Sequence, residues 1–148
     1  MNKKSENNVI QAWIQLHRAH RQLLERVEYA LKSKALPPLD WYDVLLELDR
    51  EKGTGLRQFE IGAKVLLNKH NLSRLIDRLE QNKLVCRYTS AEDGRGNQIK
   101  ITAAGEKILK QMWPVYRDAI QENFGAKLSP DETAGLSHAL SQVLVSHL

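Results

Sequence analysis

The sequence predicts a mainly α-helical protein with one small β-hairpin, and three observations support this fold class. Residues 56–82 hold two helical patterns separated by a short turn. Residues 85–101 hold two strand patterns around a turn that contains Asp-Gly and Arg-Gly. Long amphipathic patterns flank both segments. This order is typical of a winged helix-turn-helix, so we expect that lobe in residues 37–101. An N-terminal helix (1–36) and C-terminal helices (102–148) would serve dimerisation.

Length and composition predict one domain without disulfides or membrane spans. A chain of 148 residues can bury a core of its own. Its single cysteine excludes an internal disulfide framework. No apolar run approaches the roughly 18 residues of a spanning helix, and the chain does not open on a signal-peptide pattern. We therefore expect a cytoplasmic protein with no membrane partner.

The first long helix is expected from about Val9 to Ser33, and Pro37 and Pro38 prevent its continuation. Its apolar positions recur at helical spacing over more turns than a compact single domain needs. A symmetric homodimer would bury them, and a monomeric helical core is the alternative. These positions are Ile10, Trp13, Ile14, Leu24, Val27 and Leu31.

Two helices are expected before the central one. The first covers about Asp40 to Glu51, and a loop of Lys-Gly-Thr-Gly follows it. The second is short, about Arg57 to Val65, and should support the next helix as the first helix of a helix-turn-helix does. The residues expected to face inward from the first of them are Trp41, Val44, Leu45 and Leu48.

The central helix is expected between an Asn68 N-cap and Asn82–Lys83. It combines an apolar stripe with a basic and short polar face. Such side chains suit the DNA major groove, because Arg and Lys pair with guanine or phosphate and Asn pairs with adenine. An ordinary solvated helix face is the alternative. The stripe is Leu72, Leu75, Ile76 and Leu79; the opposite face carries Lys69, His70, Ser73, Arg74 and Asp77, and Asn71 and Arg78 lie at its edge.

The hairpin places Arg95 between two glycines at its tip, between strands expected at 85–89 and 98–101. A lone arginine on a thin loop can enter a narrow minor groove, where negative potential is concentrated. Asp93 would brace the loop; a solvated Arg95 paired with Asp93 is the alternative.

Residues 64–100 hold eight basic and four acidic residues, a net charge of +4, which equals that of the whole chain. The charge excess therefore lies in the segment that a phosphate surface requires.

After the hairpin, Thr102 is expected to cap a helix that runs to about Asn123. Pro114 lies inside it, so we expect a kink or the local loss of one hydrogen bond. Ser129-Pro130-Asp131-Glu132 has the pattern of a capping box that starts a last helix. The apolar positions of that last helix are Leu136, Leu140, Val143 and Leu144.

These motifs resemble the MarR family of bacterial transcription regulators over most of the chain. The spacing of the family's wing pattern is matched. Within the wing, Gly94 stands where family members often have a second basic residue. At the end of the central helix, Lys83 stands where many members have glycine. The resemblance implies dimers formed through both termini, binding of double-stranded DNA at a pseudo-palindromic operator, and repression that a small molecule releases. The matching wing residues are Asp93, Arg95, Ile99, Ile101, Thr102 and Gly105.

The resemblance also implies an effector pocket, often for phenolic or aromatic acids. Cations beside aromatic rings suit an aromatic carboxylate. The alternative is that the arginines are solvated or form dimer salt bridges and that the tryptophans are core residues. The candidates are His17, Arg18, His20 and Arg21 on the first helix, and Trp41 and Tyr42 on the second.

The sequence predicts no cofactor, no metal site and no enzymatic activity. His17, His20, His138, His147 and Cys86 form no tight ligand cluster, and no phosphate loop or nucleophile motif is present. Cys86 falls among apolar residues at a strand start, so a structural role is favoured over a reactive one. The overall interpretation is a ligand-responsive DNA-binding regulator, with a winged-helix module that binds another protein as the alternative.

Overall fold

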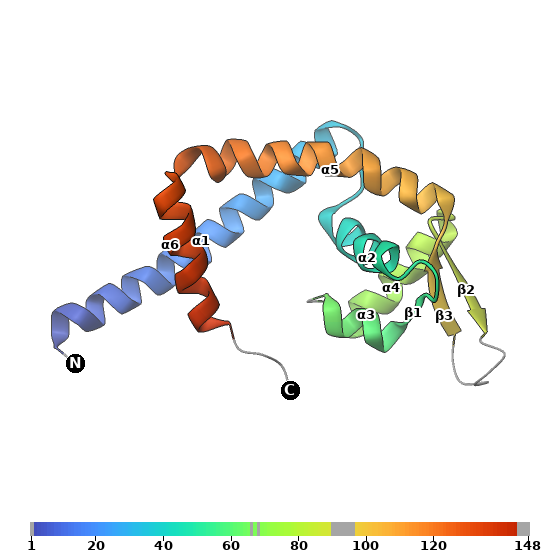
Figure 1. Cartoon of the computed structure of the whole chain (residues 1–148), viewed down its shortest axis with the longest axis horizontal. Helices are drawn as coiled ribbons and strands as arrows, with labels where there is room; N and C mark the ends of the chain where they lie inside the picture. The colour runs from blue at the N-terminus through green and yellow to red at the C-terminus, as the bar shows by residue number, and fades with distance from the viewer. Residues whose placement is uncertain (1, 66, 68, 90–96, 145–148) are drawn as a thin grey trace. The chain divides into compact units, whose positions relative to one another are not determined.

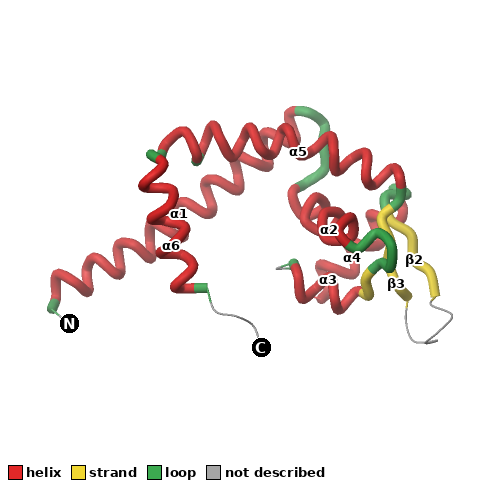
Figure 2. Tube along the Cα trace, viewed as in Figure 1, coloured by secondary structure: helices red, strands yellow, loops and turns green. Residues whose placement is uncertain are grey.

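A computed structural model describes residues 2–65, 67, 69–89 and 97–144. Contacts within the chain divide it into two units, one of residues 31–115 and one of residues 1–30 with 116–148. The described strands, yellow in Figure 2, belong to the first unit, which we call the winged unit; the described residues of the second form helices and turns, and we call it the helical unit.

The winged unit is built on three helices and a three-stranded antiparallel sheet (Figure 1). The strand order is β1-β3-β2, so the last strand in sequence is the central one. Leu56 pairs with Ile99, and Val85 pairs with Ile101. The elements are α2 (Leu39–Arg50), β1 (Leu56–Arg57), α3 (Gln58–Lys64), α4 (Lys69–Gln81), β2 (Val85–Thr89) and β3 (Asn97–Ile101).

The sequence did not predict β1, and a strand of two residues carries no periodicity to detect. The other predicted elements of this unit are confirmed, with ends shifted by one to two residues. The predicted Asn68 cap of α4 lies outside the described residues. The winged helix-turn-helix class is therefore confirmed, with a sheet of three strands.

The core of the winged unit lies where the apolar faces of α2, α3 and α4 meet the sheet. All four stripe residues predicted for α4 are buried. Burial of each such side chain contributes about 1.5–3 kcal/mol, which makes this stripe the main force that fixes α4. Trp41, predicted to face inward, is only half-buried, whereas Tyr42 is buried. Leu31 and Met112, from the helices that flank these elements, complete this core. Its other fully buried members are Val44, Leu45, Leu48, Ile61, Ile76, Leu79 and Ile99.

Helix α4 ends in a left-handed residue. Lys83 has φ 63°, its N–H bonds to the carbonyl of Glu80 at 2.9 Å, and the N–H of Leu84 bonds to the carbonyl of Leu79 at 2.9 Å. This pair of bonds is a Schellman motif, which usually carries glycine at the left-handed position. The helix terminus therefore has the geometry expected of a glycine, although lysine occupies it.

Helix α5 (Ala103–Asn123) starts against that terminus. The predicted cap is confirmed, because the Thr102 hydroxyl accepts a hydrogen bond from the N–H of Gly105 at 3.1 Å. The same hydroxyl donates to the carbonyl of Lys83 at 2.7 Å, and the N–H of Thr102 donates to the carbonyl of Leu84 at 3.0 Å. Helix α5 continues through Pro114, which has no N–H to donate, so the predicted loss of one hydrogen bond follows from the side chain itself.

The helical unit contains most of α1 (Lys3–Ser33), the end of α5, the 3₁₀ turn η1 (Gly125–Lys127) and α6 (Pro130–Val143). Helix α1 starts six residues earlier than predicted, because the Asn2 side chain accepts a hydrogen bond from the N–H of Ser5 at 2.8 Å and acts as a cap. The capping box of α6 is confirmed: the N–H of Glu132 donates to the Ser129 hydroxyl at 3.1 Å, and the N–H of Ser129 donates to the Glu132 carboxylate at 3.0 Å.

The helical unit buries little apolar surface. Among its described residues only Val27 and Ala119 are buried hydrophobic side chains, and α6 has none. Trp13 is 61% exposed, on an N-terminal half of α1 in which every described residue is exposed. A soluble helix with an apolar stripe normally covers that stripe, so this unit has apolar surface that its own described residues leave open.

Candidate nucleic-acid interface

Helix α4 holds its apolar stripe in the core and exposes the opposite side. His70, Asn71, Arg74 and Arg78 are exposed, as predicted, and Ser73 is half-buried. Lys69 is the first residue of α4, but its side chain lies outside the described part of the chain. Six of the predicted DNA-contact residues lie on α4. The five whose side chains are described stand on the side of the helix away from the core.

Arg74 and Arg78 form no ion pair with any residue that the structure describes. A guanidinium presents five donors in a planar fork, which matches guanine edges and phosphate oxygens. On an exposed helix of this length, two such groups one turn apart can reach partners outside the chain. The accessible side of α4 is thus chemically suited to bind an anionic polymer.

Asp77 lies on the same helix but faces a different partner. The Arg87 side chain, from β2, donates to the Asp77 carboxylate at 2.8 Å and to the Glu80 carboxylate at 2.8 Å, and the Arg87 N–H donates to Glu80 at 3.3 Å. Burial opposes the charged form of Arg87, but the hydrogen bonds and charges of both carboxylates outweigh it and raise the pKa of the guanidinium. Asp77 is exposed, as its predicted place on the outer face requires, but its pairing with Arg87 was not predicted.

The base of the hairpin is held on its other side by Tyr88. The Tyr88 hydroxyl bonds to the carbonyl of Thr54 and to the side-chain oxygen of Gln98, the latter at 2.6 Å. The Lys100 ammonium lies over the Tyr88 ring at 4.5 Å from its centroid. Gly55 has φ 75°, and a Cβ there would lie 2.7 Å from the carbonyl oxygen of Ile99, so the loop before β1 approaches the sheet as only glycine permits.

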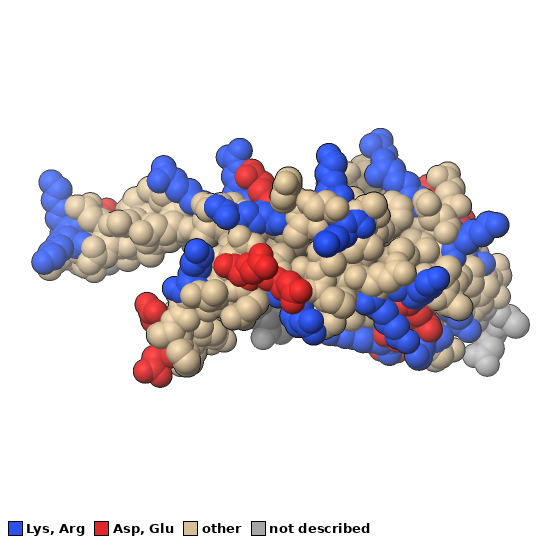
Figure 3. Space-filling view, turned by 90° about the horizontal axis from the view of Figure 1, so that it is seen from above, with Lys and Arg blue, Asp and Glu red and all other residues tan. Residues whose placement is uncertain are grey.

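The tip of the hairpin, with the predicted DNA-contact residue Arg95 and the predicted bracing residue Asp93, lies outside the described residues. On the face drawn in Figure 3, basic side chains stand at intervals with acidic ones between them and not in a single patch. The placement of charge on this face therefore does not by itself mark a nucleic-acid surface.

The predicted effector residues are divided between the two units. His17, Arg18, His20 and Arg21 are exposed on α1; His17 makes an edge contact with Trp13 at 4.4 Å between centroids, and Arg21 pairs with Glu25 at 3.5 Å. The pocket that they would form with Trp41 and Tyr42 stays a prediction.

Tyr42 stacks on Trp113 with centroids 6.3 Å apart, and it is buried. Burial, with the Asp43 carboxylate adding to it and Arg50 opposing, raises the pKa of its hydroxyl. Tyr42 therefore belongs to the core of the winged unit, whereas the alternative interpretation had placed the tryptophans there and Trp41 is only half-buried.

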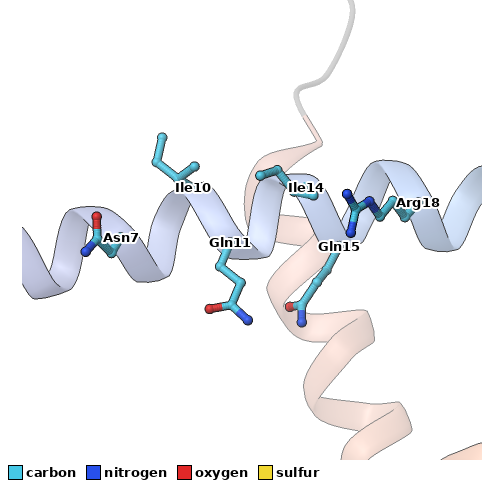
Figure 4. Close-up of a pocket in the computed structure, with 6 residues that line it drawn as sticks. All are labelled: Asn7, Ile10, Gln11, Ile14, Gln15 and Arg18. Carbon is cyan, nitrogen blue, oxygen red and sulfur yellow. The ribbon is translucent and has the colours of Figure 1, made fainter.

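Within the helical unit, α1 carries an open groove of about 380 Å³, shown in Figure 4. Ile10 and Ile14 supply its apolar lining, and Arg18 lies at one end. Of the predicted effector residues, only Arg18 lines this groove. Its other lining residues are Asn7, Gln11 and Gln15.

The Cys86 side chain is exposed, so it does not pack with the apolar residues beside it in sequence, and the structural role favoured for it stays a prediction. Val85 is buried, and strand alternation turns the next residue outward. Over the described ranges, no group of three or more His, Cys, Asp or Glu side chains is placed to hold a metal ion. No helix in the described part of the chain is long and apolar enough to cross a membrane.

Together, the α3–α4 pair, the hairpin and the exposed basic side of α4 define a winged helix-turn-helix protein. The model of the MarR family matches residues 36–96. The chain is 30% identical over 115 residues to an uncharacterized HTH-type transcriptional regulator, YkoM of Bacillus subtilis, covering 78% of this chain and 72% of that protein. The chain belongs to the MarR family of transcription regulators.

Other similarities extend over nearly the whole chain. The HTH-type transcriptional regulator MhqR of Bacillus subtilis is 29% identical over 134 residues, which is 90% of each chain. A mutant of MarR from E. coli complexed with operator DNA has a TM-score of 0.82 at 24% identity, over 94% of this chain and 97% of that one. Sco3205, a MarR family regulator from Streptomyces coelicolor in complex with DNA, has a TM-score of 0.82 at 24% identity, over 97% and 88%. These structures support the same fold.

Proposed function

We propose that this regulator binds double-stranded DNA through α4 and the hairpin, and that it represses transcription from a pseudo-palindromic operator. The observation that carries the proposal is the division of α4 into a fully buried apolar stripe and an exposed side with Arg74 and Arg78. Two of the similar structures are complexes with DNA. In this arrangement the arginines contact guanine edges or phosphates, and Asn71 contacts adenine. Arg95 enters the minor groove, with Asp93 bracing it.

A second copy of the chain completes the DNA-binding form. The apolar side chains of α1 stand open in the helical unit, and a two-fold dimer would cover them on both copies at once. Two α4 helices related by that axis would enter successive major grooves about 34 Å apart. Trp13→Glu, which places a charge in this surface, should convert a dimer into a monomer in sedimentation velocity; an unchanged mass would place the dimer contact elsewhere.

A small aromatic or phenolic acid is the effector that the proposal assigns to this regulator. An aromatic or phenolic acid would pair its carboxylate with a cation of α1, for which His17, Arg18, His20 and Arg21 are the candidates; Trp41 remains a candidate ring, and Tyr42 is a core residue. Such an acid lowers DNA affinity only if it binds better to the form with the wrong spacing of the two α4 helices.

The protein acts in the cytoplasm as a binding protein and not as an enzyme.

The test is binding to the DNA upstream of its own gene, measured over a salt series. We expect a steep salt slope, because each phosphate contact releases counterions and contributes about 0.9 to the slope. Arg74→Ala and Arg95→Ala should each weaken binding without unfolding the protein. Arg117→Ala is the matched control, because Arg117 is an exposed arginine of the helical unit that pairs with Asp118 at 3.6 Å.

Equal affinities of Arg74→Ala, Arg95→Ala and the control would overturn the assignment of α4 and the hairpin tip. No DNA binding at low salt would favour the protein-interaction module instead. The same assay with a panel of aromatic acids tests release: loss of binding with one acid identifies an effector, and no loss with any of them overturns the aromatic-acid response.

A further inference from the structure

A cluster of three charged residues joins α4 to β2 in the winged unit. One side of the Arg87 guanidinium reaches the Asp77 carboxylate and the other reaches Glu80, both at 2.8 Å. Glu80 also accepts the main-chain N–H of Arg87 at 3.3 Å. The strand is therefore attached to the helix through both its side chain and its backbone.

The two carboxylates come from one face of α4, because residues three apart lie on the same side of a helix. The Arg87 side chain is 22% exposed, and those of Asp77 and Glu80 are 55% and 43% exposed. A single exposed ion pair contributes little, but one planar fork held by two carboxylates and partly shielded from water is geometrically constrained. The cluster restricts how β2 can rotate against α4.

This restriction bears on the surface that binds DNA. Arg74 and Arg78 stand on α4, while β2 and β3 are the strands of the hairpin, so the angle between β2 and α4 sets how these strands lie relative to the exposed arginines. The next residue, Tyr88, holds the other side of β2 to Thr54 and Gln98. Tyr88 thus holds one side of β2, and Arg87 holds the side of β2 that faces α4.

We propose that Arg87 is a positioning residue for DNA binding: it holds the hairpin at a fixed angle to α4 through Asp77 and Glu80, without touching DNA. The proposal rests on the proposed function. Two of the five N–H donors of the guanidinium are committed to carboxylates of α4, and the Arg87 side chain is only 22% exposed, so the two carboxylates compete with any phosphate oxygen for it.

The experiment is a mutant cycle read by fluorescence anisotropy on the upstream DNA. Arg87→Gln should weaken binding by about tenfold or more, because it releases β2 and leaves two carboxylates uncompensated near phosphates. The Asp77→Asn/Glu80→Gln variant should also bind more weakly than the wild type, although removal of two negative charges favours DNA. Adding Arg87→Gln to that variant should change affinity by less than about threefold, because the cluster is already absent.

A direct phosphate contact predicts a different pattern. Arg87→Gln would then weaken DNA affinity by the same factor in the wild type and in the Asp77→Asn/Glu80→Gln variant. It would also lower the salt slope of binding by about 0.9 in each of them. That result overturns the proposal, and so does an Asp77→Asn/Glu80→Gln variant that binds as tightly as the wild type. If Arg87→Gln does not fold, the carboxylate variant, which keeps Arg87, decides the question alone.

Two further variants separate positioning from loss of charge and from failure of the proposed function. Arg50→Gln removes an arginine that pairs with Glu47 at 3.1 Å within α2, and it should leave affinity unchanged. Arg87→Lys keeps the positive charge, but an ammonium group is a point charge that reaches only one of the two carboxylates. This variant should therefore bind DNA more tightly than Arg87→Gln and more weakly than the wild type. If the wild type binds no DNA, the proposed function fails; if it binds and Arg74→Ala weakens it while the cycle is additive, only the positioning role fails.

Discussion

Gly105→Ala should destabilise the protein, because Gly105 lies in the first turn of α5 directly against the end of α4. A Cβ at this position would lie 2.2 Å from the carbonyl oxygen of Leu84 and 2.7 Å from Cγ1 of Ile101. The nearest obstacle is a backbone atom, which cannot turn away as a side chain can. That carbonyl also accepts the N–H of Thr102 at 3.0 Å, so it cannot move without loss of a hydrogen bond.

The magnitude follows from three contributions. Overpacking of a tight contact costs about 1–3 kcal/mol. A weakened Thr102–Leu84 hydrogen bond costs about 1 kcal/mol. Alanine recovers up to about 1 kcal/mol of helix propensity relative to glycine, and less in a first turn. The net expectation is a loss of about 2 kcal/mol in the free energy of unfolding, or about 4–8 °C in Tm for a chain of this size.

The assay is thermal and urea unfolding at one fixed protein concentration, because a dimer makes apparent stability depend on concentration. Gly135→Ala is the matched control: Gly135 lies inside α6, and a Cβ there meets nothing within 4 Å. This variant should gain about 0.5–1 kcal/mol from helix propensity alone. If Gly105→Ala is as stable as Gly135→Ala, the close approach of α5 to Leu84 is not what requires glycine.

Two further predictions concern helix ends. Lys83→Gly should be more stable than Lys83→Ala by about 1 kcal/mol in urea unfolding, because only glycine adopts the left-handed φ of 63° without strain, and equal values would contradict that strain. Hydrogen bonds from the backbone and then the side chain of Ser129 lower the pKa of Glu132, so its stabilising contribution is present above the ordinary carboxyl pKa and is lost as pH falls through the lowered one. Ser129→Ala should cost about 1 kcal/mol and move the NMR titration midpoint of Glu132 upward; an unmoved midpoint would rule out the hydroxyl as a cause.

The sequence was informative wherever local spacing decides the structure. The α4 stripe was predicted in full, because four apolar residues at helical spacing leave one way to bury them. The Thr102 cap and the Ser129–Glu132 capping box were predicted because both rely on residues within one turn. The exposed candidates on α4 followed from the same periodicity.

Long-range partners decided what local spacing could not. Tyr42, and not Trp41, is buried, and the Tyr42 ring stacks on Trp113, about 70 positions further along the chain. Arg87 could be seen as basic, but its choice of Asp77 and Glu80 depends on the turn that brings β2 back against α4. The outward turn of Cys86 depends on which face of β2 meets the core. A pattern in one segment cannot supply these pairings.

The central place of β3 in the sheet affects how the chain folds during synthesis. The β2–β3 hairpin is local and can close as soon as residue 101 is available, whereas Leu56 of β1 must wait for Ile99, 43 positions later. Closing a loop of that length has an entropy cost that a hairpin avoids, so β1 pairing should come late. Until then Leu56, which is 5% exposed in the folded chain, remains uncovered on the ribosome. β1 therefore lacks its partner strand from the time that residue 57 leaves the ribosome until residue 99 has also left it, and in that interval this lobe is open to misassembly with another nascent chain.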